Sequence, residues 1–171
     1  MADPKEKIRA WMVAEFEARI WITVSITTGD TPIENALFVA LRAWVTVNDG
    51  DFQFRRCGGE FGEPEALLKY YDDRYGEETG CLLWTPQAHI ENYRVDFAFY
   101  AVAKGGVKKL VVECDGHDFH ERTKEQARKD RSRDRRLQEL GYQVFRFTGS
   151  EIHADPMKCA LQIIRWAGFC E

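Results

Sequence analysis

The chain has 171 residues, of which 44% are hydrophobic and 30% are charged, and its formal net charge is −4. This composition is typical of a globular protein, and we expect a single domain over residues 1–171. No apolar run approaches the roughly 20 residues of a membrane span, and the charged N-terminus lacks the apolar stretch of a signal peptide. Five scattered cysteines without a CxxC pair indicate reduced thiols. We therefore expect a cytoplasmic protein that does not contact a membrane.

The first elements form a helical part over residues 1–50. Apolar residues at helical spacing predict a helix over 5–21. Residues 31–34, Thr-Pro-Ile-Glu, have the pattern of a second helix start, with threonine at the N-cap and proline in the first turn. This helix should run to about Val47. Alternation then predicts a short strand over 51–57, and a further helix is expected over 64–75.

The second half of the chain alternates strands and helices. Apolar runs predict strands over 81–84, 93–102, 107–114 and 142–147, with Gly105 and Gly106 in the turn between the middle two. A capping box at Thr123 begins a basic helix that ends at Gly141. Ser150 begins a last helix, which Pro156 restarts. The crossover from 107–114 to 142–147 implies a parallel strand pair, so the sequence predicts an α/β fold with a mixed central sheet flanked by helices.

Two of these strands carry a carboxylate inside an apolar run. Asp96 interrupts the strand over 93–102 and Glu113 the strand over 107–114. Ionised carboxylates are costly to desolvate, so they rarely lie inside strands unless they are paired or bind a metal. Alternation places Asp96 on the face opposite Val95 and Phe97. If Asp96 lies near Glu113, a cation or proton must sit between them; we interpret them as metal ligands, and the alternative is ion pairing with Arg94 or the basic helix.

Other polar residues flank this pair. Asp115 shares a strand face with the glutamate and is either another ligand or a partner of backbone amides in the Asp-Gly turn. His117, in the following loop, is a candidate to position water or phosphate or to act as a general acid. Cys114, His117 and His120 also have a C-x₂-H-x₂-H spacing that suits zinc, although no fourth ligand is evident. Glu34 fits either as the third residue of a capping box or as a side chain that projects into the site.

A strong local charge lies in residues 121–136, which hold eight basic and four acidic residues, so that the rest of the chain carries −8. This segregation suits binding to a phosphate backbone, and the alternative is a solvated helix with many ion pairs. The candidate contacts to nucleic acid are Arg122, Lys124, Arg128, Lys129 and Arg131. Lys124 lies in the first turn of the helix, where free N–H groups favour phosphate. Asp134 faces the sheet in the same helix and needs a partner, for which Arg146 and Arg133 are the candidates.

The ordered motifs DF, ExDGxxFH and DxxRDxxLxxxGxxVxRFxxxEI, over about residues 85–155, resemble the PD-(D/E)XK nuclease superfamily. They look most similar to small bacterial domains related to the very-short-patch repair endonuclease. The resemblance implies a restriction-endonuclease-like fold with its catalytic core in residues 81–155. It also implies hydrolysis of phosphodiester bonds in DNA by an endonuclease that uses Mg²⁺ or Mn²⁺.

Several residues match the superfamily pattern by position. Asp96 matches the first metal-binding aspartate, Glu113 the acidic residue of the second motif, and Glu34 the glutamate of the N-terminal helix. The backbone carbonyl of Cys114 is implied as a further metal ligand, and Gln87 matches a polar position that recurs in these relatives.

The sequence departs from the superfamily at Asp115, where many members have a lysine. The charge-stabilising role of that lysine would then fall to Lys124 or His117. The implied catalytic set is therefore Asp96, Glu113, Asp115, His117 and Lys124. We expect DNA as the partner and leave homodimer formation open. The alternatives are a catalytically inactive nucleic-acid- or partner-binding module of the same fold, and a zinc-binding structural protein.

Overall fold

A computed structural model of the chain describes residues 31–48, 52–58, 63–75, 80–103, 106–116 and 124–170. The elements are α2 (Pro32–Val47), β1 (Phe52–Arg56), α3 (Pro64–Tyr75), β2 (Gly80–Ile90), β3 (Tyr93–Ala103), β4 (Gly106–Asp115), α4 (Lys124–Glu139), β5 (Tyr142–Thr148), α5 (Gly149–Ala154) and α6 (Pro156–Ala167). The helix predicted over 5–21 and the cap predicted at Thr123 lie outside the described residues. No helix in the described ranges is long and apolar enough to cross a membrane.

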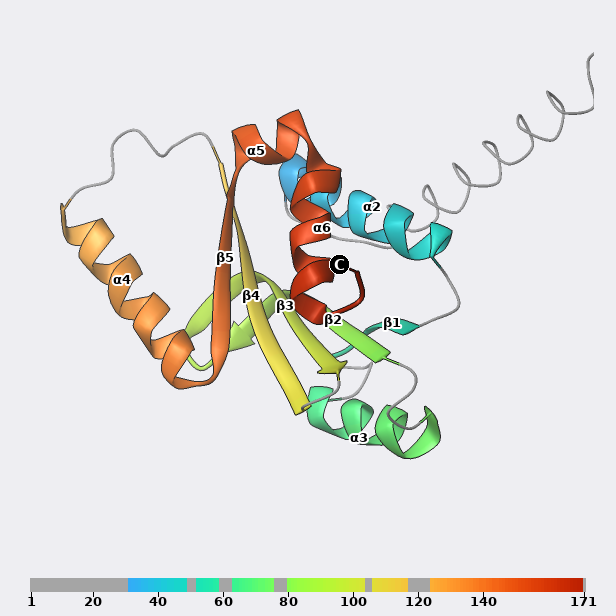
Figure 1. Cartoon of the computed structure of the whole chain (residues 1–171). Helices are drawn as coiled ribbons and strands as arrows, with labels where there is room; N and C mark the ends of the chain where they lie inside the picture. The colour runs from blue at the N-terminus through green and yellow to red at the C-terminus, as the bar shows by residue number, and fades with distance from the viewer. Residues whose placement is uncertain are drawn as a thin grey trace, which may run out of the picture.

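The five strands form one mixed sheet in the order β1-β2-β3-β4-β5 (Figure 1). Strands β2, β3 and β4 pair antiparallel, whereas β1 pairs parallel with β2 and β5 pairs parallel with β4. The parallel β4–β5 pair is joined through α4, as a parallel connection requires. This confirms the predicted α/β fold with a mixed sheet flanked by helices.

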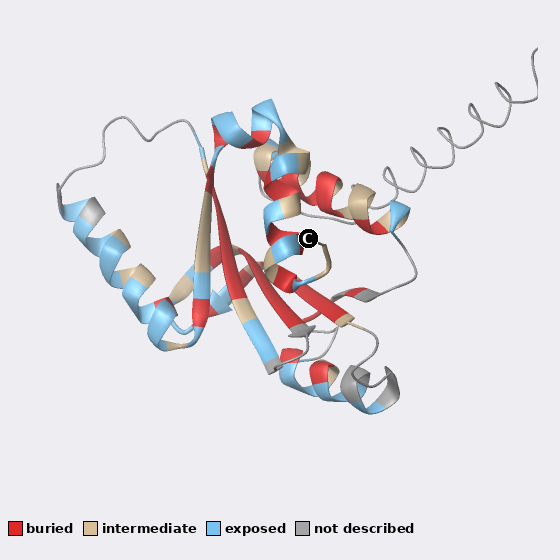
Figure 2. Cartoon of the chain, in the orientation of Figure 1, coloured by how far each residue is buried: buried red, intermediate tan, exposed pale blue. Residues whose placement is uncertain are grey.

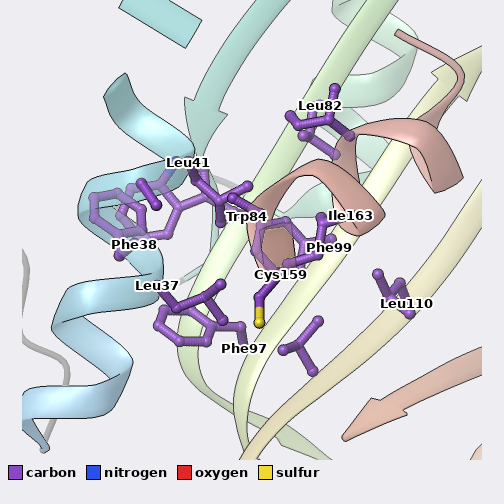
Figure 3. Close-up of a cluster of buried hydrophobic side chains, with 14 of the residues drawn as sticks. Leu37, Phe38, Leu41, Leu82, Trp84, Phe97, Phe99, Leu110, Cys159 and Ile163 are labelled. Atoms are coloured by element: carbon purple, nitrogen blue, oxygen red, sulfur yellow. The ribbon is translucent and has the colours of Figure 1, made fainter. Parts of the chain in front are cut away.

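The helices cover the two faces of the sheet unequally. On one face α2, α5 and α6 enclose an apolar core in which Leu37, Phe97 and Ile163 are fully buried (Figure 3). The opposite face packs against Leu68 of α3 and Leu137 of α4. Most of α4 is exposed, and its first half extends away from the sheet (Figure 2). This helix is therefore attached to the sheet mainly through its second half.

Two predicted boundaries are wrong for local reasons. Strand β2 does not end at residue 84, because it joins β3 through a tight turn at Glu91 and Asn92, where Glu91 has a φ of 50°. The helix expected from Ser150 begins one residue earlier, since Thr148 is its N-cap and forms a capping box with Glu151. The restart at Pro156 is confirmed.

Candidate functional site

The paired strands separate at Asp96. The β3–β4 ladder ends at the pair Phe97 and Val112, so Asp96 and Glu113 are the first opposed positions beyond it. Strand β4 continues to pair with β5 as far as Asp115. The sheet therefore forks, with the tip of the β2–β3 hairpin on one branch and β4–β5 on the other.

A backbone distortion in β2 accompanies the fork. Gln87 has a φ of 48°, in the left-handed region that residues other than glycine rarely adopt. Neither Gln87 nor Asp96 takes part in the β2–β3 register. As a result Val95 packs in one cluster with Ala98, whereas Phe97 lies in the other. The alternation predicted through Asp96 is thus wrong, because local distortions of this kind re-aim side chains.

Glu34 reaches the fork from α2 and is only 3% exposed. Thr31 accepts a hydrogen bond from the Glu34 backbone at 3.3 Å, and its hydroxyl donates to Glu34 Oε1 at 2.8 Å. Gln87 Nε2 donates to the other carboxylate oxygen at 2.6 Å. Glu34 therefore contacts the helix cap through the Thr31 hydroxyl, and the bond from Gln87 brings its carboxylate to the fork.

Asp96 is held by the backbone of the neighbouring strand. Its Oδ2 accepts a hydrogen bond from the Cys114 N–H at 2.7 Å. Burial raises the pKa of Asp96 above its ordinary value, and the bond from Cys114 opposes this rise. The charges of Glu34 and Asp115 raise the pKa further. Asp96 thus belongs to a group of carboxylates that repel one another.

Glu113 is 7% exposed and faces α4. Arg133 Nη2 donates to Glu113 Oε1 and, at 2.7 Å, to the backbone carbonyl of Arg94. Burial raises the pKa of Glu113 to about 7, with Arg133 lowering it and Asp96 adding to the rise. The ion pair with the basic helix, which was the alternative interpretation of this glutamate, is therefore present.

Asp115 and Asp134 meet at one arginine of β5. Arg146 Nη1 lies 3.8 Å from Asp115 Oδ2, and Arg146 Nη2 donates to Asp134 Oδ1 at 2.6 Å. The predicted partner of Asp134 is confirmed as Arg146. Together with Arg133, this contact gives α4 two charged links to the residues around the fork.

The remaining candidates lie along α4 or beyond the described residues. Arg128, Lys129 and Arg131 are exposed, and all three belong to the first half of α4. Lys129 Nζ is 3.2 Å from a Glu125 carboxylate oxygen, an exposed pair of small net effect. His117, His120, Arg122 and the side chain of Lys124 lie outside the part of the chain that is described.

The carboxylates at the fork have the donor chemistry of a hard-cation site. Oxygen ligands suit Mg²⁺ and Mn²⁺. In the described ranges, however, no three His, Cys, Asp or Glu side chains are already placed to hold a metal ion. Arg133 occupies one oxygen of Glu113. The donors therefore fit the cation in kind, and one of them already carries an ion pair with Arg133.

The structure opposes a zinc site at Cys114. Its side chain packs in the apolar core on the face of α2 and α6. Burial also raises the pKa of the Cys114 thiol, whereas zinc binds the thiolate.

Arg133 is a site residue that the sequence prediction missed, since it was considered only as a partner of Asp134. A signal was present in the sequence. Leu137 is an apolar residue in this basic helix and so marks its sheet-facing side, and residues four apart lie on the same face of a helix. The position of Arg133 therefore indicated a side chain directed at the strands.

A comparison with protein-family models matches residues 78–166, more than half of the chain, to REase_MTES_1575. The matched segment includes β2, the fork, α4 and most of α6. Searches of the curated proteins and of the solved structures found no significant match. The closer resemblance to the very-short-patch repair endonuclease stays a prediction. The chain belongs to the REase_MTES_1575 family, a restriction-endonuclease-like family of the PD-(D/E)XK type.

Proposed function

We propose that the chain is a metal-dependent nuclease that hydrolyses phosphodiester bonds in DNA. The observation that carries this proposal is the meeting of Asp96 and Glu113 where β3 separates from β4, in a restriction-endonuclease-like domain. A half-buried aspartate opposite a buried glutamate on the neighbouring strand raises the electrostatic cost of folding unless a cation offsets it. A metal ion bound between the two carboxylates, as in a nuclease active site, would offset this cost.

The proposed ligands of Mg²⁺ or Mn²⁺ are Asp96, Glu113 and the Cys114 carbonyl, with Glu34 as a further candidate. When bound, such a cation lowers the pKa of a water molecule and stabilises charge that develops on the phosphate. The chain contributes the placement of these ligands. The Cys114 N–H orients Asp96, and Gln87 with Thr31 orients Glu34.

The remaining residues have proposed roles around these ligands. Asp115 stands where the superfamily lysine is common, and His117 and Lys124 stay the proposed sources of charge stabilisation. Arg128, Lys129 and Arg131 form an exposed basic surface that suits contact with the phosphate backbone. Such contacts position DNA and carry no sequence information. We therefore expect binding that is strongly salt-dependent and little dependent on sequence.

The test is nicking of supercoiled plasmid during a Mg²⁺ titration. Asp96→Asn and Glu113→Gln keep the size of each side chain and remove its charge. We expect each to reduce cleavage on the order of 100-fold or more, as is typical when one electrostatic group of an active site is lost. Glu125→Gln, on the exposed side of α4, is the matched control and should cleave like the wild type. Cleavage that persists in both site variants would refute this metal centre.

The second candidate is a catalytically inactive module of the same fold that binds nucleic acid or a protein partner. Two observations favour it: Asp115 replaces the usual lysine, and Glu113 is already neutralised by Arg133. This candidate predicts that the wild type binds DNA equally well with EDTA and with Mg²⁺. It also predicts no nicking at any Mg²⁺ concentration, which separates it from the first candidate.

A further inference from the structure

Arg133 joins the two branches of the forked sheet. From the middle of α4 it donates to Glu113 on β4 and to the Arg94 carbonyl on the β2–β3 hairpin. Its guanidinium carbon also lies 5.9 Å from the ring centroid of Tyr93 on the hairpin. The guanidinium is therefore placed among the carboxylates rather than on the exposed side of the helix.

The contacts of Arg133 fall short of a well-made structural ion pair. One nitrogen, Nη2, serves both Glu113 and the carbonyl of Arg94, whereas the strong geometry is two parallel bonds to one carboxylate. Arg133 Nε is buried and has no hydrogen-bond partner among the described residues. A buried N–H without a partner is a cost to the folded state. This arrangement neutralises Glu113 and leaves Arg133 incompletely satisfied.

We infer that Arg133 is the resident counter-cation of Glu113 and that a divalent cation replaces it there. This inference rests on the proposed metal site. A divalent cation and a guanidinium at one carboxylate repel each other, and Arg133 already occupies Oε1 of Glu113, so we expect a cation bound there to displace Arg133. The carboxylate then has two alternative cationic partners, and only one of them is part of the chain.

Release of Arg133 does not detach α4. Leu137 stays fully buried against the sheet, and Arg136 Nε donates to Glu91 on the hairpin turn at 2.9 Å. Asp134 keeps its bond from Arg146. The freed guanidinium remains next to the exposed basic surface of α4, where a phosphodiester is its natural partner. Metal binding at the fork thereby adds one positive charge to the DNA-binding surface.

The direct test follows Arg133 in the wild-type protein. The Nε–H signal of Arg133 is assigned in the ¹⁵N NMR spectrum by its absence from Arg133→Lys. Mg²⁺ is then titrated while calorimetry measures its binding. We expect the signal to shift and to exchange faster with solvent in proportion to bound Mg²⁺. A signal that stays unchanged while Mg²⁺ saturates the protein overturns the inference.

A second test compares the affinity of metal-free variants for Mn²⁺. Arg133→Gln should bind about tenfold more tightly than the wild type, because it lacks a close charged competitor. Arg135→Gln removes the same charge from the exposed side of α4 and should change the affinity less than about threefold. Equal affinities for the wild type and Arg133→Gln overturn the inference and leave the metal site standing. If neither the wild type nor Arg133→Gln binds Mn²⁺, the metal site itself is overturned. If Arg133→Gln does not fold, the NMR titration of the wild type alone tests whether the metal displaces Arg133.

Discussion

The buried carboxyl group of Glu113 should make the free energy of unfolding fall as the pH rises from about 4.5 to about 7. Burial raises its pKa from 4.5 to about 7 in the folded protein. Between these values the folded protein holds a proton that the unfolded chain has lost, so stability decreases with rising pH. This contribution is fully present below pH 4.5 and is lost as the pH passes 7.

The size of the effect follows from the same two values. The difference between 4.5 and about 7 corresponds to about 3 kcal/mol of unfolding free energy. Glu113→Gln has nearly the same shape and is neutral at every pH, so it lacks this dependence. The stability of the variant relative to the wild type should therefore grow by about 3 kcal/mol between pH 4.5 and pH 8.

The assay is urea unfolding in metal-free buffer, followed by tryptophan fluorescence at intervals from pH 4.5 to pH 8. Glu125→Gln is the matched control, because its side chain is 77% exposed and surface substitutions usually change stability by less than about 0.5 kcal/mol. A stability difference between Glu113→Gln and the wild type that does not change with pH would refute the reasoning. It would mean that Arg133 keeps Glu113 ionised throughout this range.

Two further predictions concern packing and DNA binding. Gly80→Ala places a Cβ about 2.0 Å from Phe169 Cε1, so it should destabilise the protein by about 1–3 kcal/mol in thermal unfolding. The Cβ of Gly116→Ala meets no atom within 4 Å, so this substitution should not destabilise the protein by packing. Equal losses of stability in the two variants would contradict the packing argument. Arg128→Gln and Lys129→Gln should each weaken binding to all DNA sequences alike and reduce the slope of log K against log salt by about 1 in titrations. An unchanged salt slope in both variants would mean that DNA does not contact this surface of α4.

Most of the fold could be predicted because its signals are local. The cap at Thr31, the left-handed Gly141 after α4 and the apolar runs of the strands each depend on a few neighbouring residues. The fork was not predictable in this way. It coincides with the conformation of Gln87, which is not a glycine and has no local sequence signal for a positive φ. The bond from Gln87 to Glu34, 53 positions away in sequence, accompanies that conformation and is a tertiary contact.

The candidate site was likewise predictable where its signals are local and not where they depend on tertiary contacts. Asp96 and Glu113 stand out in the sequence because each puts a charge into an apolar strand, and the structure does set them opposite each other. The cation beside them was not identified, since eight basic residues crowd residues 121–136 and composition does not rank them. Helical spacing from Leu137 would have selected Arg133. The basic run therefore has two faces: Arg133 points at the strands, whereas Arg128, Lys129 and Arg131 are exposed.

Asp96 has a structural role that must be separated from its proposed role in metal binding. Where β3 leaves β4, the Cys114 N–H loses a ladder partner on β3, and Asp96 Oδ2 takes that place at 2.7 Å. Asp96→Ala would remove this acceptor and leave a buried N–H unpaired, which costs about 1–3 kcal/mol on its own. Asp96→Asn keeps an acceptor oxygen and removes only the charge. A loss of activity in the asparagine variant at unchanged stability would therefore report on charge at the fork, whereas a loss in the alanine variant would not distinguish chemistry from an opened sheet.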